Sequence, residues 1–140
     1  MPYTKVLIHA VWGTKNKYPY LNGVVLPQMI DHIKANAKKK SIKIDRINGH
    51  RDHIHCLLKL NKDITLSKTI QLIKGESSCW ANKVRLTPEK FEWAEEYYAI
   101  SISQSQLTEV RRYMDNQEEH HRKFSFAEEY QKWIETLQKG

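Results

Sequence analysis

The sequence has few of the residues that mark secreted or membrane-spanning proteins. Only two of its 140 residues are cysteines, Cys56 and Cys79, and they do not form a CxxC pair. Two isolated cysteines cannot build a disulfide framework, so a reducing cytoplasm is the expected location. The longest apolar run, from Val6 to Trp12, is interrupted by His9. A membrane-spanning helix needs about 20 apolar residues, so no membrane span is predicted.

Glycine and proline are also scarce, with five and four residues, and no repeat or flexible linker divides the chain. A single domain over residues 1–140 is therefore expected. Acidic residues are outnumbered, with 16 Asp and Glu against 23 Lys and Arg, which gives a net charge of +7. That excess favours a polyanionic partner, most often a nucleic acid. The 40% apolar content argues against a disordered chain.

The hydrophobic pattern predicts alternating strands and helices. The expected order is a strand over 5–12, a helix over 27–40, strands over 41–48 and 53–60, a helix over 65–85, a strand over 97–103, and helices over 103–122 and 125–137. The first six elements form a ferredoxin-like, or RRM-like, α+β arrangement, an antiparallel sheet with helices on one face. That topology supports many functions, so the function must be argued from particular side chains.

Two histidines alternate with apolar residues in the strand over 53–60. His53 and His55 share one face of that strand, while Ile54, Cys56 and Leu58 form an apolar opposite face. The apolar face should pack on the helices, which leaves both imidazoles on the open side of the sheet. Two such imidazoles can bind one metal ion. From the spacing alone, two surface histidines without a ligand are an equally good interpretation.

A tyrosine and a glutamine follow on the helix over 103–122. Tyr113 and Gln117 are one turn apart, so they share a helix face beside the apolar residues Leu107, Val110 and Met114. A tyrosine hydroxyl can attack phosphorus and form a covalent intermediate. Taken alone, a tyrosine packed at the rim of the helix is the more ordinary interpretation.

Together, the histidine pair and the later Tyr-x-x-x-Gln resemble the single-tyrosine HUH transposases of the IS200/IS605 type. The resemblance extends over nearly the whole chain, through Trp12-Gly-Thr-Lys15, Gly49-His-Arg-Asp-His-Ile-His55, Leu72-Ile-Lys-Gly-Glu-Ser-Ser78, Trp93 and Tyr113-Met-Asp-Asn-Gln117. It implies a C-terminal catalytic helix, with Tyr113 as the nucleophile. It also implies His53, His55 and the Gln117 amide oxygen as ligands of Mg²⁺ or Mn²⁺. The roles of His50 and Asp52 stay open.

The resemblance further implies a function and partners. Such enzymes cleave and rejoin single-stranded DNA through a 5′-phosphotyrosine, and they recognise hairpins near the ends of the mobile element. They work as homodimers, often with the tyrosine helix of one chain against the histidines of its partner. A host-serving enzyme of the REP-associated type, with the same chemistry, is an alternative within this resemblance.

Two other classes of protein are compatible with parts of the sequence. The first is a non-catalytic nucleic-acid-binding module, although histidines stand where RNA-recognition domains carry an aromatic pair. The second is a zinc site built from His50, His53, His55 and Cys56. Strand parity argues against it, because Cys56 points to the opposite face from His53 and His55.

Overall fold

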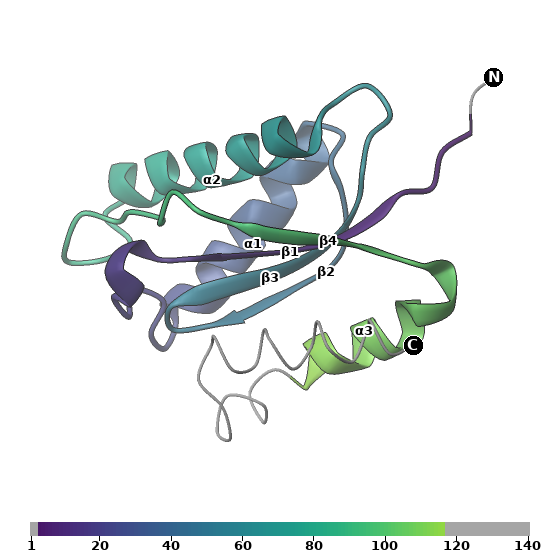
Figure 1. Cartoon of the computed structure of the whole chain (residues 1–140). Coiled ribbons are helices and arrows are strands. Elements are labelled where there is room, and N and C mark those ends of the chain that lie inside the picture. Colours follow the sequence, from purple (N-terminus) through teal and green to yellow (C-terminus); the bar gives the residue numbers. More distant parts are fainter. Residues whose placement is uncertain (1–2, 117–140) are drawn as a thin grey trace.

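The structure is a computed structural model that describes residues 3–116, and within them it forms a four-stranded antiparallel sheet. The strands are β1 (Leu7–Gly13), β2 (Lys43–His50), β3 (His53–Lys59) and β4 (Tyr98–Ile102), in the spatial order β2-β3-β1-β4. Two helices, α1 (Val25–Lys39) and α2 (Leu66–Lys83), cover one face of the sheet (Figure 1). The expected α+β architecture is confirmed. None of the described helices is long and apolar enough to cross a membrane.

The main core lies between the sheet and the two long helices. β1 and β3 are the central strands, and both are buried on both faces, which explains why their sequences read as nearly continuous apolar runs. Their helix-facing side chains pack against apolar residues of α1 and α2, among them Ala10, Trp12, Ile54, Leu58, Met29, Ile33, Ile70 and Ile73.

Local sequence signals mark where two of the helical segments begin. Thr65 caps α2 by accepting a hydrogen bond from the Lys68 amide at 3.1 Å. Ser103-Gln-Ser-Gln106 has the sequence spacing of a capping box, and the structure contains it, since the Ser103 amide donates to Gln106 Oε1 at 3.1 Å. It opens a short 3₁₀ turn, η2 (Gln104–Gln106), that leads into α3 (Leu107–Asp115). The remainder of the expected helix to residue 122 and the expected helix over 125–137 lie outside the described residues.

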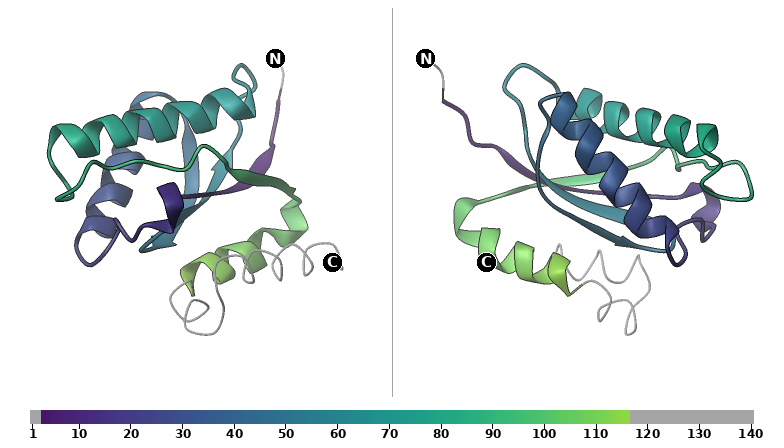
Figure 2. Two further views of the ribbon diagram at one scale, coloured as in Figure 1. Left: turned by 60° about the vertical axis from the view of Figure 1, so that its left-hand side comes forward. Right: turned by 180° about the vertical axis from the view of Figure 1, so that it is seen from behind.

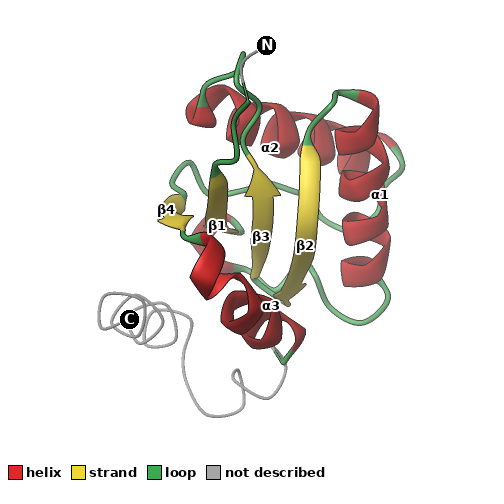
Figure 3. Cartoon of the chain, turned by 90° about the vertical axis from the view of Figure 1, so that its right-hand side faces the viewer, coloured by secondary structure: helices red, strands yellow, loops and turns green. Residues whose placement is uncertain are grey.

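α3 lies on the sheet face opposite α1 and α2 (Figures 2 and 3). The expectation that this face is open is therefore wrong. The reason is hydrophobic: the apolar stripe of α3 needs a partner, and this face offers one. The helix and the sheet together form a second small core. Leu107, Val110 and Met114 of the helix pack there against Leu7, Leu57 and Ile102 of the sheet.

Polar contacts fix how α3 sits on the sheet. A register irregularity in β2 falls at Asp45, whose carboxylate accepts two hydrogen bonds from Arg111 of α3, at 2.8 and 2.5 Å. Arg111 in turn lowers the pKa of Asp45. The Asn48 side chain donates to the Met114 carbonyl at 3.0 Å, near the end of α3. The helix that carries Tyr113 is thus held by its own chain at both the side and the end.

Candidate active site

The two histidines of the HUH pattern lie side by side on β3, on the face that α3 covers. His55 is paired with Val11 of β1 and Asn48 of β2, and His53 with Gly13 and His50. The His53 and His55 ring centroids are 5.1 Å apart, so the predicted juxtaposition is present. Both side chains are only 1% exposed. They are buried groups, which rules out the interpretation as two surface histidines.

The Nδ1 atom of His53 is engaged by the residue before it. Asp52 Oδ1 lies 2.7 Å from His53 Nδ1. Asp52 belongs to the two-residue turn between β2 and β3, which is tighter than the four-residue connection expected from the sequence. Its carbonyl accepts a hydrogen bond from the Thr14 amide at 2.9 Å, so the loop after β1 fixes the turn. An Asp52 carboxylate on Nδ1 orients the ring and leaves Nε2 as the nitrogen that could bind a metal ion.

Gly49 allows this hairpin to close. A Cβ at Gly49 would lie 2.5 Å from the His53 carbonyl oxygen and 2.9 Å from the Ile54 side chain. Only glycine permits β2 to approach β3 this closely, immediately beside the site. This supplies a physical reason for the glycine that begins the Gly49-His-Arg-Asp-His-Ile-His55 pattern.

The Nδ1 atom of His55 is engaged by a residue that the sequence interpretation did not assign. His9 Nε2 of β1 lies 3.0 Å from His55 Nδ1. His9 is 1% exposed and lies between Leu7 and Val11 on the same face of β1. Burying a polar ring among apolar neighbours costs roughly 1–3 kcal/mol unless it is hydrogen-bonded. The available signal was the interruption of an otherwise apolar strand by one histidine.

Burial favours the neutral form of the His9 and His53 imidazoles. It lowers the pKa of His9 to about 3, and it lowers that of His53 against the opposing effect of Asp52. A metal ligand must be a neutral imidazole, so burial favours the form that a metal requires. On the opposite face, burial raises the pKa of the Cys56 thiol to about 12. The zinc site with Cys56 is excluded by that separation, and within residues 3–116 no group of three or more His, Cys, Asp or Glu side chains is arranged to hold a metal.

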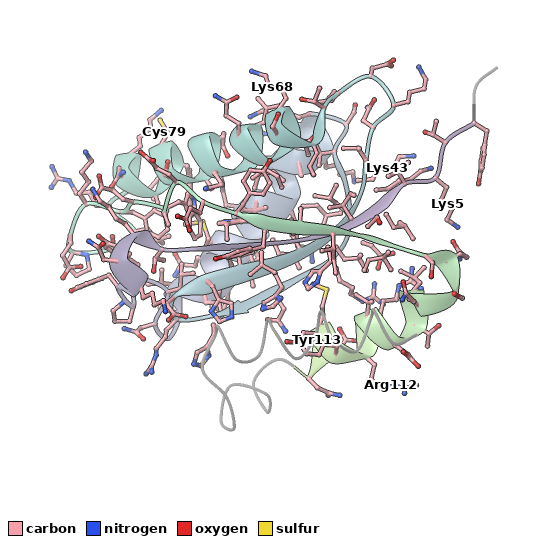
Figure 4. All side chains as sticks on the ribbon, in the orientation of Figure 1. Lys5, Lys43, Lys68, Cys79, Arg112 and Tyr113 are labelled. Atoms are coloured by element: carbon pink, nitrogen blue, oxygen red, sulfur yellow. The ribbon has the colours of Figure 1, made fainter. Side chains whose placement is uncertain are left out.

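Tyr113 lies on α3, beside the histidines of its own chain. Its ring centroid is 6.0 Å from that of His55, and the two rings meet edge to face. Figure 4 shows Tyr113 between α3 and the sheet, with Arg112 on the outer side of the helix. Asp45 and Asn48 hold α3 against its own sheet in the single chain. Docking of the tyrosine on a partner chain concerns two chains together, so it stays a prediction. Gln117, the expected third ligand, lies outside the described residues.

The buried histidines predict how stability depends on pH. In the unfolded chain His9 takes up a proton near pH 6.5, whereas in the folded chain its pKa is about 3. The unfolded state therefore binds more protons between these values, and the free energy of unfolding should fall as the pH falls. The slope for this one group is up to about 1.4 kcal/mol per pH unit. Urea unfolding in metal-free buffer, from neutral pH to about pH 4, measures it. His9→Leu should have a shallower slope, and an equal slope in both proteins would contradict the prediction.

Comparison with known proteins identifies similar proteins and a family. A family profile described as "Transposase IS200 like" matches residues 2–117. No curated protein matches this chain. A crystal structure from Deinococcus radiodurans R1, assigned as a transposase, is similar with a TM-score of 0.65 and 20% identity over 83% of this chain and 93% of that chain. A REP-associated tyrosine transposase bound to a REP hairpin is similar with a TM-score of 0.58 and 18% identity, over 82% of this chain and 66% of that chain.

The two structural similarities, at these identities, establish the fold. The family profile goes further, because it extends from the residues before β1 to the end of α3 and includes the histidine pair and the tyrosine. The chain therefore belongs to the IS200-like transposase family.

Proposed function

We propose that this transposase cleaves and rejoins single-stranded DNA, with Tyr113 as the nucleophile and His53 and His55 as ligands of a divalent metal ion. One observation carries the proposal. The ring centroid of Tyr113 lies 6.0 Å from that of His55, which belongs to a buried histidine pair whose Nδ1 atoms contact Asp52 and His9. That arrangement supports Nε2 of each histidine as a metal ligand next to the nucleophile.

The proposed ligands suit a metal ion whose coordination shell is completed by the substrate. Two neutral imidazoles carry no charge to balance a dication, and we propose the Gln117 amide oxygen as the third, also neutral, ligand. Mg²⁺ and Mn²⁺ prefer oxygen ligands, so a phosphate oxygen of the DNA would supply both the missing oxygen and the missing negative charge. When bound, such an ion withdraws charge from the phosphoryl group and fixes its orientation.

The chain's own residues carry the rest of the reaction. The Tyr113 hydroxyl loses its proton and attacks the phosphorus of a phosphodiester. The bond from phosphorus to the 3′ oxygen breaks, that oxygen gains a proton, and the downstream strand stays attached through a 5′-phosphotyrosine. Attack by another 3′-OH on the same phosphorus releases Tyr113 and joins a new strand. The covalent link preserves the phosphodiester bond energy, so no nucleotide cofactor is required.

We propose hairpin-forming single strands as the substrate. The net charge of +7 favours a polyanion. A tyrosine transposase of the same fold is bound to a REP hairpin in its structure. A host-serving enzyme of that REP-associated type would perform the same cleavage, so the genomic flanks of the gene separate it from a mobile element. Hairpin-forming ends confined to the two flanks of the gene would indicate a mobile element, whereas the same hairpins repeated along the chromosome would indicate the host-serving type.

Cleavage of a hairpin oligonucleotide labelled at its 3′ end tests the proposal. With Mn²⁺, single-stranded substrate should give a labelled protein–DNA adduct stable to denaturing electrophoresis, and a fully duplex substrate should not. Binding without an adduct, over a full titration of Mn²⁺ and Mg²⁺, would favour the non-catalytic binding module.

Gln117→Ala should weaken the metal dependence of cleavage. Alanine is the better helix former, so the change is compatible with the helix expected over 103–122 while it removes the proposed oxygen ligand. We expect the Mn²⁺ concentration for half-maximal cleavage to rise by about tenfold. The matched control is Gln106→Ala, which alters the capping box of η2 instead. An unchanged Mn²⁺ titration for Gln117→Ala would remove this residue from the proposed site.

We propose that the enzyme acts as a homodimer, since one tyrosine holds one DNA end while excision and joining involve two. Mixing His53→Ala chains with Tyr113→Phe chains shows which chain supplies each group. Because α3 is held on its own sheet, we expect each tyrosine to serve its own histidines and the mixture to stay inactive. Restored cleavage, with exchange of tagged chains confirmed, would instead show that the tyrosine acts on the partner's histidines.

A further inference from the structure

His9 has a defined geometry toward His55 that goes beyond ordinary packing. Their nitrogens are 3.0 Å apart, the ring centroids are 5.1 Å apart, and the ring planes differ by only 20°. The centroids are about 2 Å farther apart than the two nitrogens, so the nitrogens lie between the rings and the rings meet edge to edge. The small angle between the ring planes makes the two rings nearly coplanar. In that geometry an N–H bond of one ring points along the plane at the lone pair of the other.

Such a pair has two possible arrangements of its protons, with opposite consequences. If His55 donates from Nδ1, its Nε2 carries a lone pair and can bind a metal. If His9 donates from Nε2, the proton of neutral His55 must lie on its own Nε2, which blocks that atom as a ligand. Only the first arrangement is compatible with the proposed role of His55.

We propose that His9 is a positioning residue of the metal site: it accepts the Nδ1 proton of His55 and thereby leaves Nε2 of His55 free of a proton. The inference rests on the proposed function, because it assigns a partner to one of its metal ligands. Asp52 stands in the same relation to His53, through the 2.7 Å contact at Nδ1. The two proposed ligands thus have different hydrogen-bond partners at Nδ1: a carboxylate for His53 and an imidazole for His55.

The strand pairing shows why His9 is the residue in this position. His9 is paired with Leu57 in the β1–β3 ladder, two residues from His55, and all three side chains share one face. The β1–β3 register therefore brings the His9 ring next to His55 across the ladder. A register shift of one residue would turn His9 toward the helices and break the contact.

Nitrogen-15 NMR of the imidazoles tests the proton arrangement in the metal-free, full-length protein. The wild-type chain should show His55 protonated on Nδ1. His9→Leu, which offers no acceptor, should shift His55 toward protonation on Nε2. His9→Gln places an amide oxygen near the position of the lost nitrogen and should restore the wild-type state. Protonation of wild-type His55 on Nε2 would overturn the inference without any variant having to fold.

Calorimetric titration with Ni²⁺, which binds imidazole more tightly than Mn²⁺, supplies a second readout. His9→Leu should weaken binding by about tenfold or more, while His9→Gln should stay within about threefold of wild type. His53→Ala gives the background from histidines elsewhere in the chain. Equal affinity of wild type and His9→Leu would overturn the role of His9. If wild type itself binds no better than His53→Ala, the proposed metal site fails, and the NMR result still decides the proton arrangement.

Discussion

Replacing His53 or His55 should abolish DNA cleavage while hairpin binding survives. A metal ion contributes several kcal/mol to the stabilisation of a phosphoryl transition state, so losing one of its few ligands should slow cleavage by roughly a thousandfold. Hairpin affinity should change by less than about tenfold, because DNA affinity comes largely from phosphate contacts distributed over the protein surface. Cleavage rates with Mn²⁺, and binding measured without metal, separate the two effects.

The burial of both rings decides which substitutions to use. Each side chain is 1% exposed, so alanine would leave a cavity and lower stability as well as remove a ligand. His53→Asn and His55→Asn retain a polar side chain and more of the volume, and they should be as inactive as the alanine variants. His32→Ala is the matched control, because His32 is partly buried and bonded to Glu76 on the helix side of the sheet. Cleavage in the asparagine variants at the wild-type rate would show that these histidines are structural.

Tyr113→Phe should eliminate the covalent protein–DNA adduct and cleavage together. The substitution removes only the hydroxyl and keeps the ring that meets His55 edge to face, so folding and DNA binding should be unchanged. Loss of a nucleophile lowers turnover by at least about 10⁴-fold in enzymes that depend on one. The measurement is the yield of adduct on 3′-labelled hairpin DNA after denaturation.

Tyr98 provides a matched control for the loss of a hydroxyl. Tyr98 lies on β4, is paired with Val11 and therefore shares the sheet face of the histidines, and 45% of it is exposed. Tyr98→Phe should retain cleavage. The opposite pattern, an active Tyr113→Phe protein and an inactive Tyr98→Phe protein, would indicate that Tyr98 of β4 is the nucleophile.

Several features followed from the sequence because they depend on neighbouring residues. Strand alternation alone placed His53 and His55 on one face and Cys56 on the other. The spacing of Ser103 and Gln106 indicated where the third helix region begins, and apolar spacing identified the inner face of α3. The resemblance to HUH transposases combined such local patterns, which is why the family was identified correctly before any tertiary contact was known.

The environment of those residues depended on contacts that no local pattern encodes. His9 is 46 residues from His55 in the chain, and only the β1–β3 register makes them partners. The burial of both site histidines, with α3 packed on their face, was likewise missed. A strand pattern shows which residues share a face, but not what later covers it. Two features decide where α3 packs. One is the apolar surface that three separate strands build from Leu7, Leu57 and Ile102. The other is the ion pair between Asp45 and Arg111, which are 66 residues apart in the chain. The sequence thus determined the chemical groups and their parity, while the tertiary structure decided their burial, their hydrogen-bond partners and the place of Tyr113, because these arise from pairings between distant segments.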